Sequence, residues 1–285
     1  MTHAAAGTPA PDRPLSFAHR GSSARAPQNT MAAFERAARS GASGVEIDVH
    51  LTRDGVVVLM HDDTVDATTD GTGAIARLTV AELRALDAGS WFGPGFAGER
   101  VPTWEEFLRF ADREPHLEIL LEIKGEWGID AVEILLAPLA PGGAFAHLAP
   151  RVIAQSFWPS SVAACRDALP SLRRGLLVLD LSAWDPSSAP EVTEEEAETY
   201  RRGPLRFAAV DEAIRTAADL EAEMLNPMGS FLASDPTLVD RIHAAGLRAM
   251  VWTLNAPDAW ALAARSGADG VITDDPEGYA AWSPS

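Results

Sequence analysis

Short apolar runs alternate along the chain with segments in which apolar residues recur at helical spacing. Each run is short enough for one strand, and helix start and stop signals follow most of them. In the clearest helix, Asp235-Pro236 would form the start and Gly246 the end. The runs predict strands at residues 15–18, 44–52, 117–123, 152–157, 175–180, 222–226, 248–254 and 269–273. The sequence therefore predicts repeated strand-then-helix units.

This alternation is typical of an α/β fold of the TIM type, the (β/α)8 barrel, which usually needs roughly 250 residues. The chain has 285 residues, and eight of its apolar runs can serve as barrel strands. A doubly wound open sheet is the alternative, but no glycine-rich phosphate turn follows the first strand. We predict one TIM-barrel domain over residues 15–285, preceded by a flexible N-terminal segment over residues 1–14.

The alternation breaks after the second predicted strand. Residues 56–60 form another apolar run, and the Asp54-Gly55 turn before it means that the chain doubles back or continues as a short extension. Residues 62–102 are rich in Gly, Thr and Asp, and a capping box at Thr79 predicts one short helix there. A second capping box, at Thr103, begins a longer helix. We interpret residues 62–102 as a small insertion at the rim of the barrel.

The charge of the chain argues against one class of partner. There are 41 acidic and 23 basic residues, which give a net charge of -18, and there is no basic run. Such a chain has no field that attracts nucleic acid or an anionic membrane surface. No run is long enough to span a membrane, no secretory signal is recognisable, and the single Cys165 cannot form an intramolecular disulfide. We expect a cytoplasmic protein without nucleic-acid partners or stable membrane insertion, and the pattern leaves the oligomeric state open.

Polar side chains stand where several predicted strands end, which is where a barrel of this kind carries its reacting groups. Glu46 and Asp48 are two residues apart, so the strand period of two places both carboxylates on one face. Glu122 and Lys124 have the same spacing. The complete set is His19, Arg20, Glu46, Asp48, His61, Glu122 and Lys124. Buried carboxylates are costly without a partner, so this clustering indicates a functional site.

Glu46, Asp48 and Glu122 would converge as an all-oxygen set, which suits one hard divalent ion, Mg2+ or Ca2+, better than zinc. The three carboxylates, one such ion, Arg20, Lys124 and one phosphodiester together carry no net charge. Without the phosphodiester the site keeps one positive charge, so it would attract a phosphate despite the acidic chain. Ion pairs with arginines are the alternative, but two adjacent carboxylates need more positive charge than one guanidinium supplies.

Two histidines, His19 and His61, lie at the same predicted rim. Histidine changes its charge near neutral pH, so one of them could accept a proton and the other donate one. Hydrolysis of an ester bond to phosphorus requires these two roles. His50 shares the strand face of Glu46 and Asp48 and is a rival for either role, although we expect it to sit past the strand end.

Other residues at strand ends also have purely structural explanations. Trp252 is a candidate for a substrate-contacting pocket wall, but it could equally pack in the core. Gln155 and Phe157 share a face at another strand end, where we expect core packing. Cys165 lies in a helical pattern and is expected to be buried and inert.

Short motifs in a characteristic order and spacing resemble those of the glycerophosphodiester phosphodiesterase family, a group of metal-dependent TIM-barrel enzymes. The resemblance runs from residue 15 to about residue 280. The motifs are Ala18-His19-Arg20-Gly21, Ala26-Pro27-Gln28-Asn29-Thr30, Glu46-Ile47-Asp48-Val49, Thr52-Arg53-Asp54-Gly55, His61-Asp62, Thr68-Thr69-Asp70-Gly71-Thr72-Gly73, Val101-Pro102-Thr103, Glu122-Ile123-Lys124, Trp252-Thr253-Leu254-Asn255 and Thr273-Asp274-Asp275-Pro276.

The resemblance implies hydrolysis of a small-molecule glycerophosphodiester to an alcohol and glycerol 3-phosphate, a step of lipid and glycerol metabolism. It implies that the three carboxylates hold the divalent metal and that the two histidines are the acid and base. Arg20 and Lys124 would contact the phosphate, and the insertion after His61 would cover the glycerol side of the substrate.

Two departures from the family pattern concern the substrate. Gln28 stands where the family usually has Glu, and Ala67 stands where an Arg commonly precedes the Thr-Thr pair. A lysophospholipase D-like or cyclising phosphodiesterase remains an alternative, as does a non-catalytic barrel that binds metal or phosphate. Lys124 is the only lysine among the 23 basic residues, the others being arginine, so we expect a role that arginine cannot fill.

Overall fold

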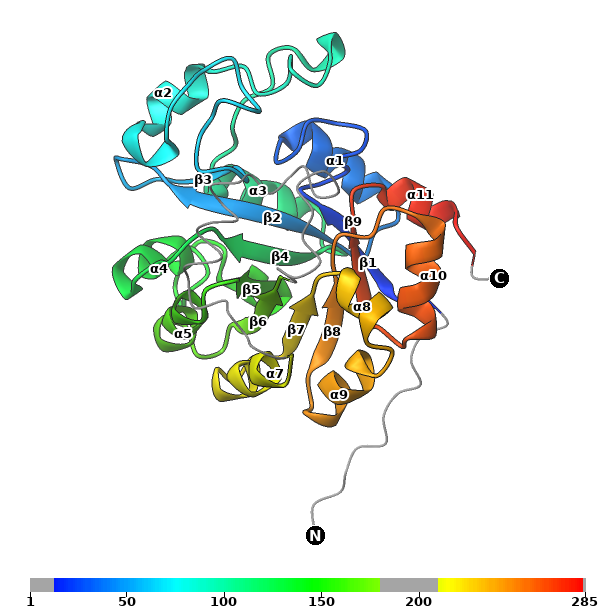
Figure 1. Ribbon diagram of the computed structural model, residues 1–285. Coiled ribbons are helices and arrows are strands. Elements are labelled where there is room, and N and C mark those ends of the chain that lie inside the picture. The colour runs from blue at the N-terminus through cyan, green and yellow to red at the C-terminus, as the bar shows by residue number, and fades with distance from the viewer. Residues whose placement is uncertain (1–12, 180–209, 284–285) are drawn as a thin grey trace.

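Eight parallel strands close into a barrel, and helices surround it (Figure 1). The computed structural model describes residues 13–179 and 210–283. The barrel closes because β1 pairs with β9 on one side and with β2 on the other. Its strands are β1 Leu15–His19, β2 Gly44–Leu51, β4 Glu118–Ile123, β5 Val152–Ser156, β6 Arg173–Val178, β7 Met224–Pro227, β8 Arg248–Val251 and β9 Gly270–Thr273. The predicted TIM-type barrel is confirmed.

Inside the barrel, an apolar layer supports a polar layer. The apolar layer is one buried cluster of Phe17, Leu120, Ile153, Met224, Met250 and Ile272. Two residues further along the chain from each of these lie His19, Glu122, Gln155, Asn226, Trp252 and Asp274. Because side chains of a strand alternate between its faces, the second set continues the inward-facing rows of the first. The polar layer therefore lies at the carboxyl ends of the strands.

A second apolar layer fills the space between the barrel and the helices, which explains why the strands read as continuous apolar runs. Phe34 and Phe107, from two of these helices, pack edge to face with ring centroids 4.9 Å apart. The helices are α1 Met31–Arg39, α3 Trp104–Arg113, α4 Ile129–Leu136, α5 Pro159–Ala168, α7 Val210–Asp219, α8 Ser230–Ser234, α9 Leu238–Ala244, α10 Pro257–Arg265 and α11 Pro276–Ala281, with a 3-10 turn η3 Ala146–Arg151 before β5.

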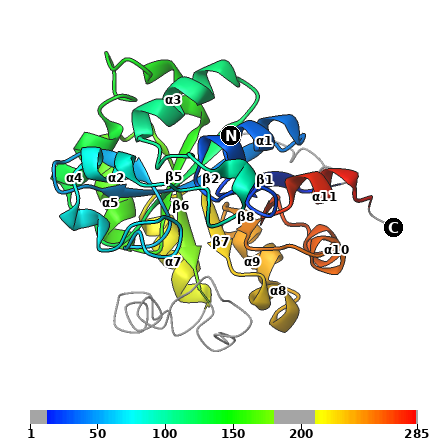
Figure 2. The ribbon, with the colours of Figure 1, turned by 90° about the horizontal axis from the view of Figure 1, so that it is seen from above.

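The segment between the second strand and α3 projects from one side of the barrel, next to β2 (Figures 1 and 2). The chain first doubles back as β3 Val57–Leu59, which pairs antiparallel with β2. It then forms η1 Ile75–Arg77, α2 Val80–Ala85 and η2 Pro94–Phe96. This insertion has a small apolar cluster of its own, which includes Val65, Leu83 and Val101. Both predicted capping boxes are present, at the starts of α2 and α3.

Several element boundaries differ from those predicted. β7 begins at Met224 instead of residue 222, and β8 ends at Val251 instead of residue 254. The helix expected from Asp235 begins at Leu238, because the Asp235 carboxylate accepts the backbone N–H of Thr237 at 2.9 Å in a turn before it. Residue 180 of one predicted strand and residues 1–12 of the predicted N-terminal segment lie outside the described residues. None of the helices within residues 13–179 and 210–283 combines the length and apolar character needed to cross a bilayer.

Candidate active site

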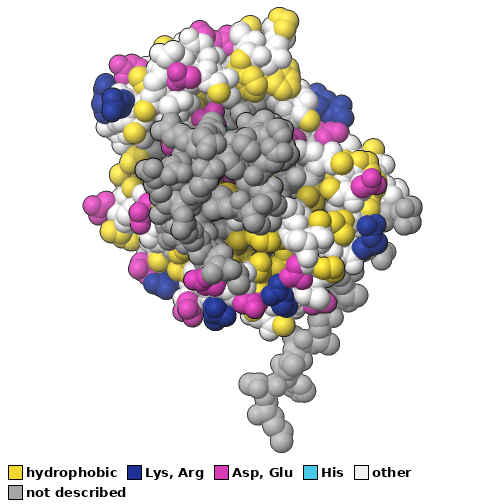
Figure 3. Space-filling view, viewed as in Figure 1, with side chains coloured by type: hydrophobic (Ala, Val, Ile, Leu, Met, Phe, Trp, Pro, Cys, Tyr) yellow, Lys and Arg dark blue, Asp and Glu magenta, His cyan; other side chains and the backbone are white. Residues whose placement is uncertain are grey.

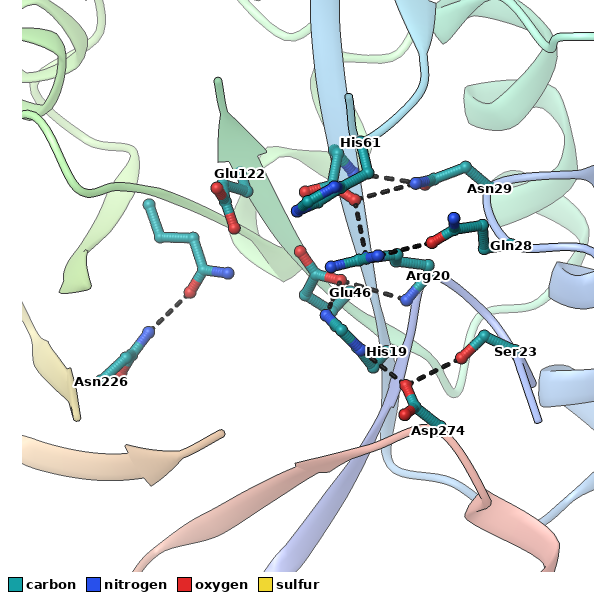
Figure 4. Close-up of polar contacts among 12 residues, drawn as sticks. His19, Arg20, Ser23, Gln28, Asn29, Glu46, His61, Glu122, Asn226 and Asp274 are labelled. Carbon is teal, nitrogen blue, oxygen red and sulfur yellow. Dashed lines mark hydrogen bonds and ion pairs between the residues drawn. The ribbon is translucent and has the colours of Figure 1, made fainter. Parts of the chain in front are cut away.

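Three buried carboxylates from neighbouring strands form the centre of the polar layer (Figure 4). Glu46 and Asp48 lie on β2, and Asp48 is the register neighbour of Glu122 on β4. The three residues expose 2%, 1% and 8% of their surface, and one oxygen of each lies within 4.8 Å of the others. Glu46 Oε1 and Asp48 Oδ1 are buried without a hydrogen-bond partner. Buried anionic oxygens in this state call for a cation.

Burial and mutual repulsion oppose the ionisation of three carboxyl groups so close together. Burial raises the pKa of Glu46 well above its ordinary range, and the charges of Asp48 and Glu122 raise it further. Burial also raises the pKa of Glu122, against the opposing charge of Lys124. At Asp48 burial is outweighed by the charges of Lys124 and Arg20, which lower its pKa. An oxygen-bound divalent cation would relieve this repulsion, so the three residues fit such an ion.

Arg20 and Lys124 bring positive charge to the edge of the carboxylate cluster, as the sequence predicted. Lys124 Nζ lies 2.9 Å from Glu122 Oε1 and 3.7 Å from Asp48 Oδ1. Arg20 Nε lies 3.4 Å from Asp48 Oδ2, and its Nη1 donates to Gln28 Oε1 at 2.5 Å. Gln28 is one of the two departures from the family motif. A neutral amide here orients the guanidinium without neutralising it, so the charge of Arg20 stays directed toward the cluster.

His19 is held by a carboxylate from the last barrel strand. Its Nδ1 lies 2.6 Å from Asp274 Oδ1, and its Nε2 lies 4.0 Å from Glu46 Oε2 (Figure 4). Asp274 is itself fixed, because Oδ1 accepts from Ser23 Oγ at 2.9 Å and Oδ2 accepts from Asn255 Nδ2 at 2.5 Å. Burial opposes ionisation of Asp274, but His19 and its other partners hold the pKa of this carboxyl well below its usual range. The pair therefore fixes the ring of His19 with Nε2 toward the carboxylate cluster.

His61 has the same construction with a neighbouring carboxylate. Its Nδ1 lies 2.7 Å from Asp62 Oδ1. Burial lowers the pKa of His61 well below its ordinary value, and the charges of Arg20 and Lys124 lower it further, so the ring is neutral at neutral pH. His50 lies within β2, not past the strand end as expected, and its Nε2 is 3.1 Å from the carbonyl oxygen of His61. His50 thus helps to hold the backbone of His61 in position.

A buried amide pair lies across the barrel from the histidines. Asn226 Nδ2 donates to Gln155 Oε1 at 2.6 Å, and neither residue exposes more than 1% of its surface. The pair can form because Gly175 occupies the strand between them, where a Cβ would lie 3.2 Å from Asn226 Nδ2. Gln155 Nε2 and Asn226 Oδ1 are buried without a hydrogen-bond partner. The barrel thus offers one unused donor and one unused acceptor near Glu122, since Gln155 is the register neighbour of Glu122 on the next strand. Core packing alone does not explain these two atoms.

Trp252 forms a wall of the barrel mouth next to this amide pair. Its Nε1 donates to the backbone oxygen of Asn226 at 2.7 Å. Its ring packs edge to face against Phe157, with the centroids 5.4 Å apart. The ring of Trp252 is partly exposed, whereas Phe157 is buried. Trp252 is therefore placed where a molecule in the mouth would touch it.

The sequence-based prediction gave no role to several residues that the structure brings to the site. Asn29 is one of them, since its Nδ2 donates to Asp48 Oδ2 at 2.8 Å. The others are Asp62, Gln155, Asn226 and Asp274. A signal was present for three of these residues, because Gln155, Asn226 and Asp274 each follow a residue of the apolar layer by two positions. Because these residues are polar and stand at inward-facing positions, they belong to the same layer as Glu122.

Comparisons with known proteins give one consistent result. The model of the glycerophosphoryl diester phosphodiesterase family matches residues 19–278. A glycerophosphodiester phosphodiesterase of Caldanaerobacter subterraneus subsp. tengcongensis is 34% identical over 264 residues, which cover 92% of this chain and 95% of the relative. A Bacillus subtilis protein of the same name is 35% identical over 205 residues, 68% of each chain.

Two solved structures with the same fold are those of phosphodiesterases. An Oleispira antarctica phosphodiesterase in complex with the product sn-glycerol-3-phosphate is 27% identical, with a TM-score of 0.71 over 94% of this chain and 95% of that chain. A glycerophosphodiester phosphodiesterase from Agrobacterium tumefaciens has a TM-score of 0.70 over 94% of this chain and 100% of that chain. At 24% identity, the second structure supports the fold alone.

Proposed function

Since this chain belongs to the glycerophosphoryl diester phosphodiesterase family and is an enzyme of that class, we propose that it hydrolyses a glycerophosphodiester to an alcohol and glycerol 3-phosphate at the site described above. One observation carries the proposal. Three buried carboxylates that fit a divalent ion share one site with two histidines, each of which is held at Nδ1 by a carboxylate. This arrangement supplies the charge and the two proton-transfer groups that cleavage of a phosphodiester needs.

Glu46, Asp48 and Glu122 would hold one divalent cation, Mg2+ or Ca2+. When bound, such an ion neutralises phosphate oxygens and lowers the pKa of a hydroxyl or water that attacks phosphorus. Arg20 and Lys124 would bind the remaining charge of the phosphate, since both side chains are more than nine-tenths buried and point at the cluster. In a site that excludes water, fixed positive groups stabilise developing negative charge without reorganisation.

The two histidines would divide the proton transfers between them. His61 is neutral at neutral pH because burial and nearby cations lower its pKa, which suits it to accept the proton of the nucleophile. His19 would then donate a proton from Nε2 to the leaving alkoxide. Asp274 behind its Nδ1 stabilises the positive ring before that transfer. Asp274 and Asp62 are therefore positioning residues, because they act through the histidines.

A panel of substrates tests the proposed function. The purified enzyme is assayed with Mg2+, with Ca2+ and with EDTA on glycerophosphocholine, glycerophosphoethanolamine and a lysophospholipid. We expect release of free alcohol and glycerol 3-phosphate from the two glycerophosphodiesters, lost with EDTA and restored by metal. Preferential turnover of the lysolipid would instead identify a lysophospholipase D-like enzyme. Accumulation of a cyclic phosphate would identify a cyclising phosphodiesterase. Metal binding without turnover of any ester would make the barrel a binding protein.

Replacing Lys124 with arginine should lower kcat by about 10- to 100-fold, a loss typical of residues that support a metal site. Lys124 Nζ reaches both Glu122 and Asp48 from a side chain only 6% exposed, and a planar guanidinium does not reproduce this compact point charge. Steady-state kinetics measure the effect. Arg109→Lys, at an exposed ion pair with Glu105, is the control and should change nothing. Wild-type kinetics for Lys124→Arg would show that the position of the sole lysine has no functional meaning.

Changing Asp274 to asparagine should lower kcat by about 10²-fold or more while KM changes little, because an amide favours the wrong tautomer of His19. The readout is the kcat-against-KM split at saturating metal. Asp112→Asn is a matched control, since Asp112 makes an equivalent 2.6 Å contact with His147 on the surface. Equal kcat for the two variants would contradict a positioning role for Asp274.

A further inference from the structure

Three successive backbone carbonyls at the end of β4 each accept a hydrogen bond from a side chain. The carbonyl oxygens of residues 123, 124 and 125 accept from Ser156 Oγ at 2.8 Å, Trp127 Nε1 at 2.8 Å and Ser161 Oγ at 3.1 Å. The donors come from β5, from the loop before α4 and from α5, and all three residues are buried. We call these three donors the carbonyl clamp. The catalytic scheme uses none of them.

The carbonyl clamp lies where the regular strand ends. β4 ends at Ile123, and the backbone N–H of Lys124 makes one more hydrogen bond, to the carbonyl oxygen of Val49 at 3.3 Å. Gly125 then turns the chain with a φ of +80°, and residues 125 and 126 are exposed. The chain therefore leaves the sheet at Lys124. The sheet holds the N–H side of this residue, and Trp127 holds its carbonyl side.

Trp127 is itself fixed on two sides. Its backbone N–H donates to Ser161 Oγ at 2.8 Å, and its ring belongs to the buried apolar cluster that also contains Ile123 and Val132. A packed ring of this size cannot shift without the loss of many contacts. The hydrogen bond from its Nε1 therefore ties the backbone of Lys124 to the core of the protein.

The place of Lys124 matters because its charge acts at short range. Its Nζ lies 2.9 Å from Glu122 Oε1 and 3.7 Å from Asp48 Oδ1, at the end of a flexible four-carbon stem. On the face seen in Figure 3, the Lys and Arg side chains of the described residues lie in separate groups near the periphery, with acidic side chains among them. A phosphate at the carboxylate cluster would thus meet its positive charge inside the barrel, from Arg20 and Lys124. A misplacement of about 1 Å in an active site can lower a rate by about 10²-fold.

We propose that Trp127 is a positioning residue of the active site. By holding the carbonyl of Lys124, it keeps the ammonium group beside Glu122 and Asp48, where the phosphate of the substrate would bind. It acts through Lys124 and not on the reacting atoms. This inference rests on the proposed function, because Lys124 has its role in binding phosphate only there.

Trp104 provides a matched control for the purely structural explanation, in which an indole fills the core and satisfies a buried carbonyl. Its Nε1 donates to the carbonyl oxygen of Leu135 at 2.9 Å, and only 3% of its surface is exposed. This hydrogen bond joins α3 to α4 in the helical layer outside the barrel. Trp104→Phe and Trp127→Phe thus remove the same kind of hydrogen bond, one of them away from Lys124.

The test measures three quantities for wild type and both Phe variants. They are kcat/KM on glycerophosphocholine, the affinity for inorganic phosphate at saturating Mg2+ by calorimetry, and Tm. Lys124→Met, alone and combined with Trp127→Phe, completes a double-mutant cycle. Ser161→Ala is a second variant of the carbonyl clamp, since Ser161 accepts the N–H of Trp127. It takes the place of Trp127→Phe in every comparison if that variant does not fold.

We expect both Phe variants to lower Tm by a similar amount, whereas only Trp127→Phe lowers kcat/KM, by about 10-fold, as partners that orient a site residue do. Its affinity for phosphate should fall as well, and that of Trp104→Phe should not. Lys124→Met should cost about 10²-fold or more. In that background Trp127→Phe should cost no more than about 2-fold further, because the residue it positions is already gone.

Three results would each overturn the positioning role: equal kcat/KM losses in the two Phe variants, no loss in Trp127→Phe, or a full additional loss in the Lys124→Met background. A purely structural role predicts the first or the last of these. If wild type cleaves no glycerophosphodiester, the proposed function itself fails. The phosphate affinities of Trp127→Phe and Trp104→Phe then decide the positioning role without turnover: a loss confined to Trp127→Phe supports it, and equal affinities contradict it.

Discussion

Replacing Glu46 with glutamine should abolish metal-dependent hydrolysis and at the same time stabilise the metal-free protein. The loss of activity follows from the loss of one of three anionic ligands. A bound divalent ion contributes several kcal/mol of charge stabilisation in such reactions, so we expect kcat to fall by about 10³-fold or more. The side chain keeps its shape, and the amide oxygen of the Glu46→Gln variant can still accept the backbone N–H that Arg20 donates to Glu46 Oε2 at 3.1 Å.

The gain in stability has an electrostatic cause. Burial and the charges of Asp48 and Glu122 raise the pKa of Glu46, so the folded metal-free protein prefers this group protonated. A raised folded-state pKa gives stability below the unfolded pKa, about 4.3 for glutamate, that is lost as the pH rises through the raised value. Metal-free wild type should therefore lose stability as the pH rises from the unfolded pKa of glutamate to the raised pKa of Glu46. The neutral amide of Glu46→Gln removes that loss.

Thermal denaturation in EDTA at several pH values, with and without added Mg2+ or Ca2+, measures both effects. Metal should raise the Tm of wild type and leave that of Glu46→Gln nearly unchanged. Glu118→Gln is the control, because Glu118 begins the neighbouring strand and pairs with Arg173 at 2.7 Å, away from the site. A Glu46→Gln variant that keeps full activity and a metal-dependent Tm would remove Glu46 from the metal site.

Removing either histidine should lower the rate by about 10²- to 10⁴-fold, the usual contribution of a positioned acid or base. His19→Ala and His61→Ala should both retain the metal-dependent rise in Tm, because neither side chain belongs to the carboxylate cluster. His147→Ala, a surface histidine with 59% of its side chain exposed, is the control. Full activity of a variant that lacks both His19 and His61 would overturn the acid-base assignment.

The two histidines can be told apart by the leaving group. A p-nitrophenyl ester of glycerol phosphate expels an anion that needs no proton, so a missing general acid matters little for it. His19→Ala should therefore lose much less activity on this ester than on glycerophosphocholine. His61→Ala should lose a similar factor on both, since the nucleophile still needs a base. The reverse pattern would exchange the two roles.

Much of the barrel was accessible from the sequence because its signals are local. Apolar runs bounded by caps and glycines predicted eight strands, and the spacing of two between Glu46 and Asp48 predicted two carboxylates on one face. The same local logic failed at the helix expected from Asp235, where side-chain hydrogen bonds in a turn delay the start. Predicted boundaries depend on such contacts more than on residue type.

The sequence by itself predicted the kind of site, since three carboxylates, two histidines and a lone lysine at strand ends indicate a metal and acid-base chemistry. Only the tertiary structure decided how these groups are held. Asp274 reaches His19 across 255 positions, and Asn226 reaches Gln155 across 71. Barrel closure brings Asp274 to His19, and a glycine on the intervening strand lets Asn226 reach Gln155. The inward-facing position of Gln155, Asn226 and Asp274 has a periodic signal, but their choice of partner has none, because it depends on which strands become neighbours and on how far each side chain extends.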